Sequence, residues 1–262
     1  MENAHEIRRL ETKTDFEAVK EQALWAGLKP GMRVLDIGCG SGKTTHFLRR
    51  LTEKSGEVVG VDNSEERINY ARDRYSSRNI SFICKDVYSG LTELGSFDFI
   101  WVRFFLEYHK SKSPDLLASF SGLLNPGGIM CLIDLDHNSL SHYGLPGRMF
   151  RAINGCAGCL EEKADFDPYI GRKLYSFLYD LHYSEIDVRI GVHHLLFGKI
   201  SGADEFNWIT KVAVAAKDSG YPFEEYPGGF DEFFQECKQY LNDPRRFTYT
   251  PLISCRGRRP RE

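Results

Sequence analysis

The sequence predicts an α/β fold built on a mostly parallel sheet with helices on both faces. Short apolar runs alternate with helical patterns throughout residues 31–136, at 33–38, 57–62, 80–84, 97–102 and 129–134. Strands separated by helices favour right-handed crossovers, which place helices on both faces of a parallel sheet. The first run leads into the glycine cluster Gly38-Cys39-Gly40-Ser41-Gly42, and a helical pattern follows. This strand–turn–helix order is typical of a ligand-binding edge.

The helices between these strands are predicted from apolar spacing and from the residues that begin or end them. An N-terminal helix is expected over 5–28, because apolar residues recur at helical spacing until Gly27. Ser64 is a suitable N-cap for the helix after the second strand. The expected helices of this half cover 5–28, about 42–53, 64–75 and 114–123.

The pattern becomes less regular after Asp136. Residues 137–165 contain turn formers, glycines and few long apolar runs, so they predict a loop region. The remaining elements predict a hairpin-like strand pair whose connection is enlarged by two helices. They are a helix at 168–182, a strand at 185–197, a helical insert within 201–245 and a last strand at 246–256. The segment 137–200 is expected to form the C-terminal half of the domain and to contain a substrate loop.

Composition places the chain among ordinary globular proteins. The 262 residues are 42% hydrophobic and 27% charged, and the net charge is −3, which excludes an overall basic field for nucleic acid. No run approaches ~18 consecutive apolar residues, so no membrane span is expected. Seven cysteines, several of them in predicted strands, are typical of reduced thiols in a cytoplasmic protein. The basic segment 256–261 is expected to be a solvated tail.

The glycine cluster fits one type of ligand loop better than two others. A dinucleotide fingerprint requires a third glycine where Lys43 stands, and a phosphate-binding P-loop requires its first glycine at Ile37. Each alternative fails by one residue. The remaining pattern is D-x-G-x-G-x-G, from Asp36 to Gly42.

Polar residues follow three further predicted strands, where ligands bind in open α/β sheets. Asp62 ends the second strand about 20 residues after the loop, where a carboxylate accepts hydrogen bonds from both hydroxyls of a ribose. Lys85-Asp86-Val87 follows the third strand, with Asp86 placed for an adenine amino group and Val87 for the ring. Val102-Arg103-Phe104 ends the fourth strand. The order and spacing of this set carry the signal, because a single Asp after a strand is usually a turn residue.

The successive motifs resemble those of class I, Rossmann-like S-adenosylmethionine-dependent methyltransferases, and most closely the group that includes ubiquinone- and menaquinone-biosynthesis enzymes. The resemblance lies in Val34–Gly42, Val61-Asp62, Lys85-Asp86, Phe97-Asp98 and Leu124–Gly128. It implies a seven-stranded sheet, S-adenosylmethionine as methyl donor and S-adenosylhomocysteine as product. It also implies that the N-terminal helix covers the cofactor, with Arg9 facing the methionine carboxylate. The expected cofactor-binding residues are Arg9, Asp36, Gly38, Cys39, Gly40, Asp62, Asn63, Asp86, Val87 and Arg103.

The expected reaction is in-line displacement at a sulfonium methyl, driven mainly by positioning. A base is needed only for some acceptors. Candidates lie after the fourth and fifth strands, and His137 is the preferred one because it follows the fifth strand directly. Phe104, Tyr108 and His109 are the expected substrate contacts. The other candidates are Glu107, Asp134, Asp136 and His142.

Alternatives remain open at this point. The chain could be a non-catalytic S-adenosylmethionine-binding module, a methyltransferase acting on protein or RNA, or, less well supported, a nicotinamide oxidoreductase. Residues 102–105, Val-Arg-Phe-Phe, lack the Asn/Asp-Pro-Pro-Tyr/Phe signature of enzymes that methylate nucleic-acid amines, so a small-molecule acceptor is favoured and nucleic acid disfavoured. Cys156-Ala157-Gly158-Cys159 has no second pair for zinc, so no metal site is expected. The aromatic insert is a candidate lid over an apolar acceptor.

Overall fold

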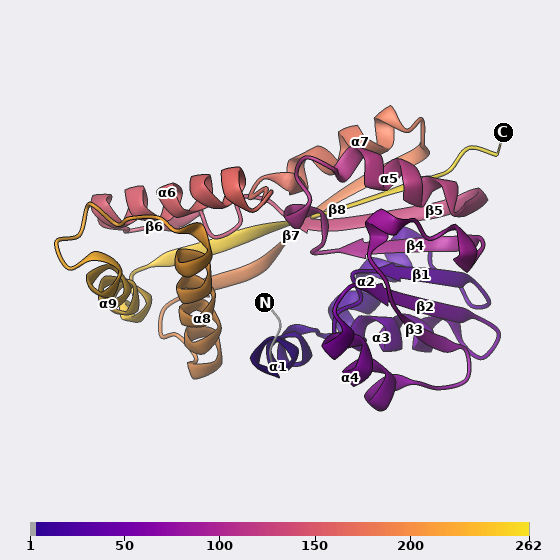
Figure 1. The fold of residues 1–262 in the computed structure, drawn as a ribbon, viewed down its shortest axis with the longest axis horizontal. Helices are drawn as coiled ribbons and strands as arrows, with labels where there is room; N and C mark the ends of the chain where they lie inside the picture. Colours follow the sequence, from indigo (N-terminus) through magenta and orange to yellow (C-terminus); the bar gives the residue numbers. More distant parts are fainter. Residues whose placement is uncertain (1–3, 262) are drawn as a thin grey trace.

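A computed structural model describes residues 4–261 and shows the expected mixed α/β sheet (Figure 1). The strands follow the order β3-β2-β1-β4-β5-β8-β6, and β7 pairs with β8. Pairing is parallel from β1 to β5, whereas β6, β7 and β8 pair antiparallel. The strands are β1 (Arg33–Ile37), β2 (Glu57–Asp62), β3 (Ile80–Cys84), β4 (Phe97–Arg103), β5 (Leu124–Leu135), β6 (His142–Tyr143), β7 (Ser184–Phe197) and β8 (Phe247–Arg258). The predicted fold class is confirmed, with the two-residue β6 as an addition.

Alternate residues of the central strands contribute to two hydrophobic cores, one on each face of the sheet. On one face Leu35 and Ile100 pack in a cluster with α5 (Ser113–Gly122), the 3-10 turn η4 (Ile170–Lys173) and α7 (Leu174–Asp180). On the other face Val34 and Trp101 pack with α2 (Phe16–Ala26) and α3 (Lys43–Thr52). A smaller cluster joins α4 (Glu65–Tyr75) to β3. The period-two alternation of buried strands thus explains why helices cover both faces.

The expected single helix at 5–28 is two helices, so that prediction was wrong in its continuity. Helix α1 (Ala4–Lys13) ends, and α2 begins after Asp15. Asp15 has extended backbone angles and its carboxylate accepts a hydrogen bond from the Ala18 N–H at 2.9 Å. This N-cap competes with helix continuation, because a short acidic side chain satisfies an N–H that has no helical partner. The break allows α1 to turn toward the glycine loop.

Residues 147–163 form the 17-residue helix α6 (Gly147–Lys163), so the expected loop over 137–165 was also wrong. Glycines concealed this helix in the sequence. At Gly155 a Cβ would lie 2.2 Å from the Tyr221 ring, so the glycine makes room for a neighbouring aromatic side chain rather than a turn. The expected helix at 168–182 is likewise divided into η4 and α7.

The insert forms its own layer with α6 rather than extending the sheet. Helices α8 (Gly202–Ser219) and α9 (Gly229–Asn242) project beyond the strands together with α6, as Figure 1 shows. Their shared core includes Met149, Trp208, Phe233 and Tyr240. The aromatic residues of the insert therefore contribute to a core, and they also line a cavity described below.

Most of the basic C-terminal segment is tied to the sheet. Strand β8 continues to Arg258, whose guanidinium donates a hydrogen bond to the carbonyl of Gly127 at 2.7 Å. Arg258 also pairs with Glu185, and the Arg259 N–H donates to the Gly128 carbonyl. The expectation of a solvated tail over 256–261 was therefore wrong for its first residues.

Candidate active site

The glycine loop is a tight turn that only glycine fits well. Gly38, Gly40 and Gly42 all have positive φ values, of 69°, 55° and 83°. The N–H groups of Gly38 and Cys39 both donate to the Val61 carbonyl, which fastens the loop to the end of β2. A Cβ at Gly42 would lie 2.6 Å from Ala71 Cβ, so this glycine also allows α4 to approach. The loop exposes backbone at the carboxyl edge of the sheet, where the sequence predicts a ligand.

Asp62 lies at the end of β2 and faces that loop. Its Oδ2 accepts a hydrogen bond from the Gly40 N–H at 2.9 Å. Its Oδ1 accepts from the Ser64 N–H at 3.0 Å and from two guanidinium nitrogens of Arg67, the shorter at 2.8 Å. These bonds hold the carboxylate in one orientation beside the loop. Asn63, the next residue, is exposed and its side-chain oxygen accepts a longer bond from Arg67.

Two predicted cofactor residues lie inside the sheet edge rather than on its surface. Asp36 is 2% exposed and accepts a hydrogen bond from the Thr45 hydroxyl at 2.7 Å. Arg103 interacts electrostatically with Asp36 and with Asp134, and its guanidinium lies 4.2 Å from the Phe104 ring centroid. Burial lowers the pKa of Arg103 to about 10. These contacts join the end of β1 to the ends of β4 and β5, and the cofactor-binding roles of Asp36 and Arg103 stay predictions.

Asp36 provides a pH-dependent prediction. Burial raises its pKa from 3.8 to about 7, against the lowering effects of Thr45 and Arg103. Between these values the folded chain keeps a proton that the unfolded chain releases, so stability falls as pH rises, by up to ~1.4 kcal/mol per pH unit. Asp36→Asn is expected to make this fall shallower in urea unfolding measured from about pH 5 to pH 7. Exposed Asp73→Asn is the control, and an equal slope in all three proteins would contradict the prediction.

The end of β3 presents the pair predicted to bind a base. Asp86 caps the turn η1 (Val87–Ser89) by accepting a hydrogen bond from the Tyr88 N–H, and Val87 is buried in the core. The Tyr88 hydroxyl lies 2.6 Å from His109 Nδ1. Burial lowers the pKa of His109, whose ring also packs on Phe105 with centroids 4.3 Å apart. The structure thus brings the segments after β3 and β4 together.

Helix α1 lies against the glycine loop. The Ser41 hydroxyl donates to Glu11 Oε1 at 2.7 Å, the Tyr75 hydroxyl donates to Glu11 Oε2 at 2.5 Å, and the Lys43 amine donates to the Glu11 carbonyl. Arg9, on the same helix, interacts electrostatically with Glu107 and Lys211. Helix α1 therefore connects the loop, the turn after β4 and the insert, which agrees with its place beside α8 in Figure 1.

A chain of buried polar groups runs from the sheet to the insert. The Glu107 N–H donates to Asp134 Oδ2 at 3.3 Å, and the Asn138 amide donates to Glu107 Oε2 at 2.5 Å. The Lys211 amine in turn donates to Asn138 Oδ1 at 2.5 Å. Burial raises the pKa of both Glu107 and Asp134, and the Glu107 carboxylate adds to the rise at Asp134, whereas Lys211 acts to lower the pKa of Glu107. Lys211 and Asn138 were not among the residues expected from the sequence.

The remaining predicted substrate and catalytic residues each contact a residue outside the predicted set. His137 packs edge-on against Tyr169, with ring centroids 5.1 Å apart, and has a φ of 49°. Tyr108 is 47% exposed and lies near Phe166. Phe104 packs against His193 and the core under α2. Asp136 is held by Arg172 in an ion pair. None of these contacts assigns a role, and His137 stays a prediction.

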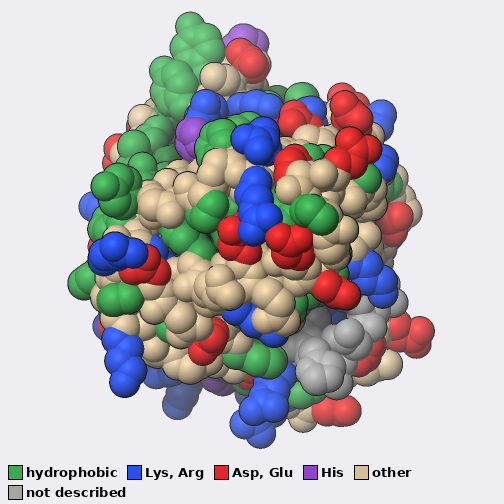
Figure 2. All heavy atoms as spheres, turned by 90° about the vertical axis from the view of Figure 1, so that its left-hand side faces the viewer, with side chains coloured by type: hydrophobic (Ala, Val, Ile, Leu, Met, Phe, Trp, Pro, Cys, Tyr) green, Lys and Arg blue, Asp and Glu red, His purple; other side chains and the backbone are tan. Residues whose placement is uncertain are grey.

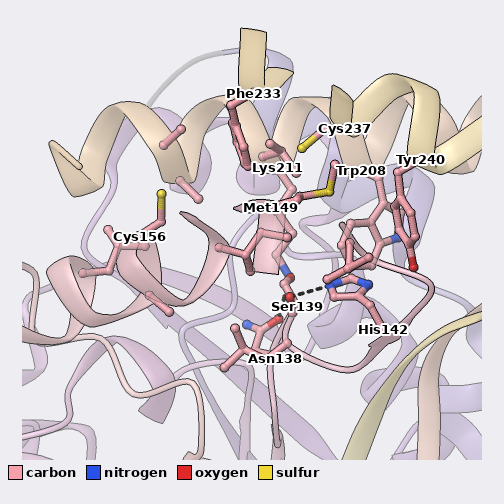
Figure 3. A pocket seen from close by; sticks show the side chains of 18 of the residues that line it. Asn138, Ser139, His142, Met149, Cys156, Trp208, Lys211, Phe233, Cys237 and Tyr240 are labelled. Atoms are coloured by element: carbon pink, nitrogen blue, oxygen red, sulfur yellow. Dashed lines mark hydrogen bonds between the residues drawn. The ribbon is translucent and has the colours of Figure 1, made fainter. Parts of the chain in front are cut away.

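A cavity of about 110 Å³ lies between α6, α8 and α9 and reaches the loop after β5 (Figure 3). Its walls are mostly apolar. Its polar end contains Asn138, Ser139, His142 and Lys211, and Figure 3 shows these side chains grouped at one side. His142 Nε2 lies 2.7 Å from the Ser139 carbonyl and its Nδ1 lies 2.9 Å from the Thr248 hydroxyl.

Metal ligands do not gather anywhere within residues 4–261: no group of three or more His, Cys, Asp or Glu side chains is arranged to hold an ion. His193 and His194 are neighbours in β7 beside a register shift in the β7–β8 pairing, and their ring centroids lie 4.2 Å apart. No helix in the described part of the chain is long and apolar enough to cross a bilayer.

Comparison with known proteins decides the family of the central segment. Residues 34–128, which contain the glycine loop, Asp62 and Asp86, match the family model described as a methyltransferase domain. Residues 34–128 are a methyltransferase domain. The segments that cover this methyltransferase domain, α1 and the insert, lie outside the match.

Curated relatives align with the methyltransferase domain but not with the whole chain. The protein-L-isoaspartate O-methyltransferase of Thermotoga maritima is 37% identical over 81 residues, which are 30% of this chain and 26% of that protein. The demethylmenaquinone methyltransferase of Staphylococcus aureus is 29% identical over 118 residues, which are 44% of this chain and 47% of that protein. The alignments thus span about a quarter and about half of these relatives.

Solved structures match over most of the chain. Phosphoethanolamine N-methyltransferase 2 of Haemonchus contortus, in complex with S-adenosyl-L-methionine, gives a TM-score of 0.57 at 16% identity, covering 93% of this chain and 52% of that one. Coclaurine N-methyltransferase, bound to N-methylheliamine and SAH, gives 0.54 at 18% identity, covering 91% and 72%. At these identities the likeness concerns the fold.

Proposed function

We propose that this chain transfers a methyl group from S-adenosylmethionine to a small-molecule acceptor by in-line displacement. The observation that carries the proposal is the fixed carboxylate of Asp62 beside the glycine loop, within hydrogen-bond distance of the Gly40 N–H. This is the position where a ribose is recognised in open α/β sheets. The family of residues 34–128 supports the same donor.

The residues present suit the cofactor. Asp62 Oδ2 accepts one hydrogen bond, from the Gly40 N–H, so one of its two acceptor positions is open to a ribose hydroxyl. The second hydroxyl would take the place of Arg67 on Oδ1. Asp86 and Val87 would hold the adenine, one by accepting from its amino group and the other by packing. Gly38 and Gly40 turn the loop with positive φ values, and Arg9 lies on helix α1, which contacts the same loop. We assign these residues to cofactor binding together with Cys39 and Asn63.

The protein's contribution to the reaction is alignment. Bound S-adenosylmethionine supplies a methyl group already activated on a positive sulfur. Holding an acceptor in line with that methyl group is worth as much as ~7–11 kcal/mol of the barrier. Helix α1 contacts the glycine loop directly and its Arg9 interacts with Lys211 of α8, so both elements are placed to exclude water from the site.

Calorimetric titration with S-adenosylhomocysteine, with NAD as the control ligand, tests the proposal. We expect S-adenosylhomocysteine to bind and NAD to give no heat. Equal affinity for NAD, or no binding of S-adenosylhomocysteine, would overturn the proposed cofactor. Binding without methylation of any acceptor in a broad small-molecule panel would favour a non-catalytic binding module.

A macromolecular acceptor is less well supported. On the face drawn in Figure 2, basic and acidic side chains are interspersed rather than gathered into a basic patch. Arg258 and Arg259 of the basic segment 256–261 are hydrogen-bonded to the carbonyls of Gly127 and Gly128 in β5. Nucleic-acid binding requires a clustered positive field. We therefore propose a small acceptor and a cytoplasmic enzyme.

A further inference from the structure

The cavity between α6, α8 and α9 has a chemistry that narrows the class of acceptor. It is about 110 Å³ in volume, the same order as the ~150 Å³ cavities that take up a benzene ring. Its apolar wall comes from three helices and includes Met149 and Trp208. Such a cavity suits a small aromatic ring or a branched aliphatic group, because moving an apolar group from water into the cavity is favourable.

One side chain carries the positive charge of the cavity wall. The described residues that line the cavity include Lys211 and no Asp or Glu. His142, the other basic group, has a pKa lowered by burial and both ring nitrogens within hydrogen-bond distance of the protein, so it is uncharged at neutral pH. Burial also lowers the pKa of Lys211, to about 8, which leaves its amine mostly protonated at pH 7.

The Lys211 ammonium group has more N–H donors than its hydrogen bond to Asn138 uses. Lysine offers three N–H groups, and among the described residues Asn138 is the one hydrogen-bond partner found for Lys211. Figure 3 shows the Lys211 side chain reaching down the cavity toward Asn138. Glu107 accepts a hydrogen bond from the same Asn138 and interacts electrostatically with Lys211, but it does not line the cavity.

We infer that the cavity binds a small apolar molecule with one anionic oxygen group, a carboxylate, and that Lys211 binds this group. The inference rests on the proposed function, since it makes this molecule the methyl acceptor. An anion inside an apolar wall is stable only if it is paired and hydrogen-bonded, which the spare Lys211 donors provide. A cationic amine of the same size would instead place two positive charges together.

Titration with three molecules of similar size but different charge tests the inference on the full chain. The probes are benzoate, benzyl alcohol and benzylamine, each measured by calorimetry at pH 7. We expect benzoate to bind at least tenfold more tightly than benzyl alcohol, and benzylamine not to bind. Binding of benzylamine as tight as that of benzoate, or no binding of benzoate, would overturn the inference.

Variants of the chain test whether benzoate binds at Lys211 in the cavity. Lys211→Met keeps the length of the side chain and is expected to reduce benzoate affinity at least tenfold, whereas Lys217→Met, exposed on the same helix, leaves it unchanged. Ala215→Phe fills the cavity without removing the charge and is expected to abolish binding of every probe. Unchanged benzoate affinity in either Lys211→Met or Ala215→Phe, with both proteins folded by thermal melting, would place the probe elsewhere and overturn the inference.

Parallel titration with S-adenosylhomocysteine separates the two proposals. If S-adenosylhomocysteine binds and benzoate does not, the acceptor class is wrong and the cofactor proposal stands. If benzoate binds in the cavity and S-adenosylhomocysteine does not bind, the cofactor proposal fails while the anion site stands.

Discussion

Asp62→Ala is expected to weaken the binding of S-adenosylhomocysteine by about 100-fold. In the proposed complex the carboxylate accepts hydrogen bonds from both ribose hydroxyls, and a hydrogen bond to a charged group contributes ~1.5–3 kcal/mol. Loss of two such bonds at the lower figure is about 3 kcal/mol, or roughly two powers of ten in affinity. Calorimetric titration of the variant measures this loss directly.

The control must separate ribose binding from the shape of the loop, because Asp62 also holds the Gly40 N–H and Arg67. Arg67→Gln removes the guanidinium that contacts Asp62 and leaves the carboxylate in place. We expect Arg67→Gln to change the affinity less than threefold. An equal loss in both variants would show that the ion pair, rather than a ribose contact, governs binding. Unchanged affinity in Asp62→Ala would refute the role of Asp62.

The central strands were predictable because they are fully buried and short. A strand covered on both faces is apolar along its whole length, as in Val58–Val61, and the glycines after β1 mark a turn that other residues cannot form. The positions of Asp62 and Asp86 follow from strand ends alone, since parallel strands deliver their carboxyl ends to one edge. The cofactor half of the candidate site is therefore a local property of the sequence.

The acceptor half was not predictable in the same way. Helix α6 contains Gly155, which makes room for Tyr221, and no local pattern reveals a partner 66 residues away. Lys211 is one of many lysines in the sequence, and its distinction comes from the packing of α8 against the loop after β5. Asn138 adjoins His137, the predicted catalytic residue, yet Asn138 is the residue that joins Glu107 to Lys211. Such sites are assembled by tertiary contacts between segments far apart in the chain.

Arg103 shows that the location of a residue can be predicted without the direction of its side chain. The sequence places it at the end of the fourth strand beside the glycine loop, and the structure confirms that place. Its guanidinium, however, interacts with Asp36 and Asp134 inside the protein. The sequence shows that a charge stands at the strand end, but the direction of the side chain depends on the buried carboxyl groups around it.

Gly42→Val is expected to destabilise the folded chain strongly, through both backbone strain and crowding. The φ of Gly42 is 83°, a backbone region that costs a residue with a Cβ ~1–2 kcal/mol. A Cβ there would also lie 2.6 Å from Ala71 Cβ and 2.8 Å from the Phe82 ring, and overpacking of this kind costs typically ~1–3 kcal/mol. The two effects together predict a loss of about 3 kcal/mol or more in the free energy of unfolding.

Gly198→Ala separates backbone strain from crowding. Its φ is 61°, and no atom lies within 4 Å of the position that a Cβ would take. Urea unfolding should therefore show a loss of only ~1–2 kcal/mol for Gly198→Ala and a clearly larger one for Gly42→Val. A smaller or equal loss at Gly42 would mean that α4 can move away from the loop. In that case the close approach of α4 would not be what shapes the glycine turn, and the orientation of Gly40 toward Asp62 would depend on β2 alone.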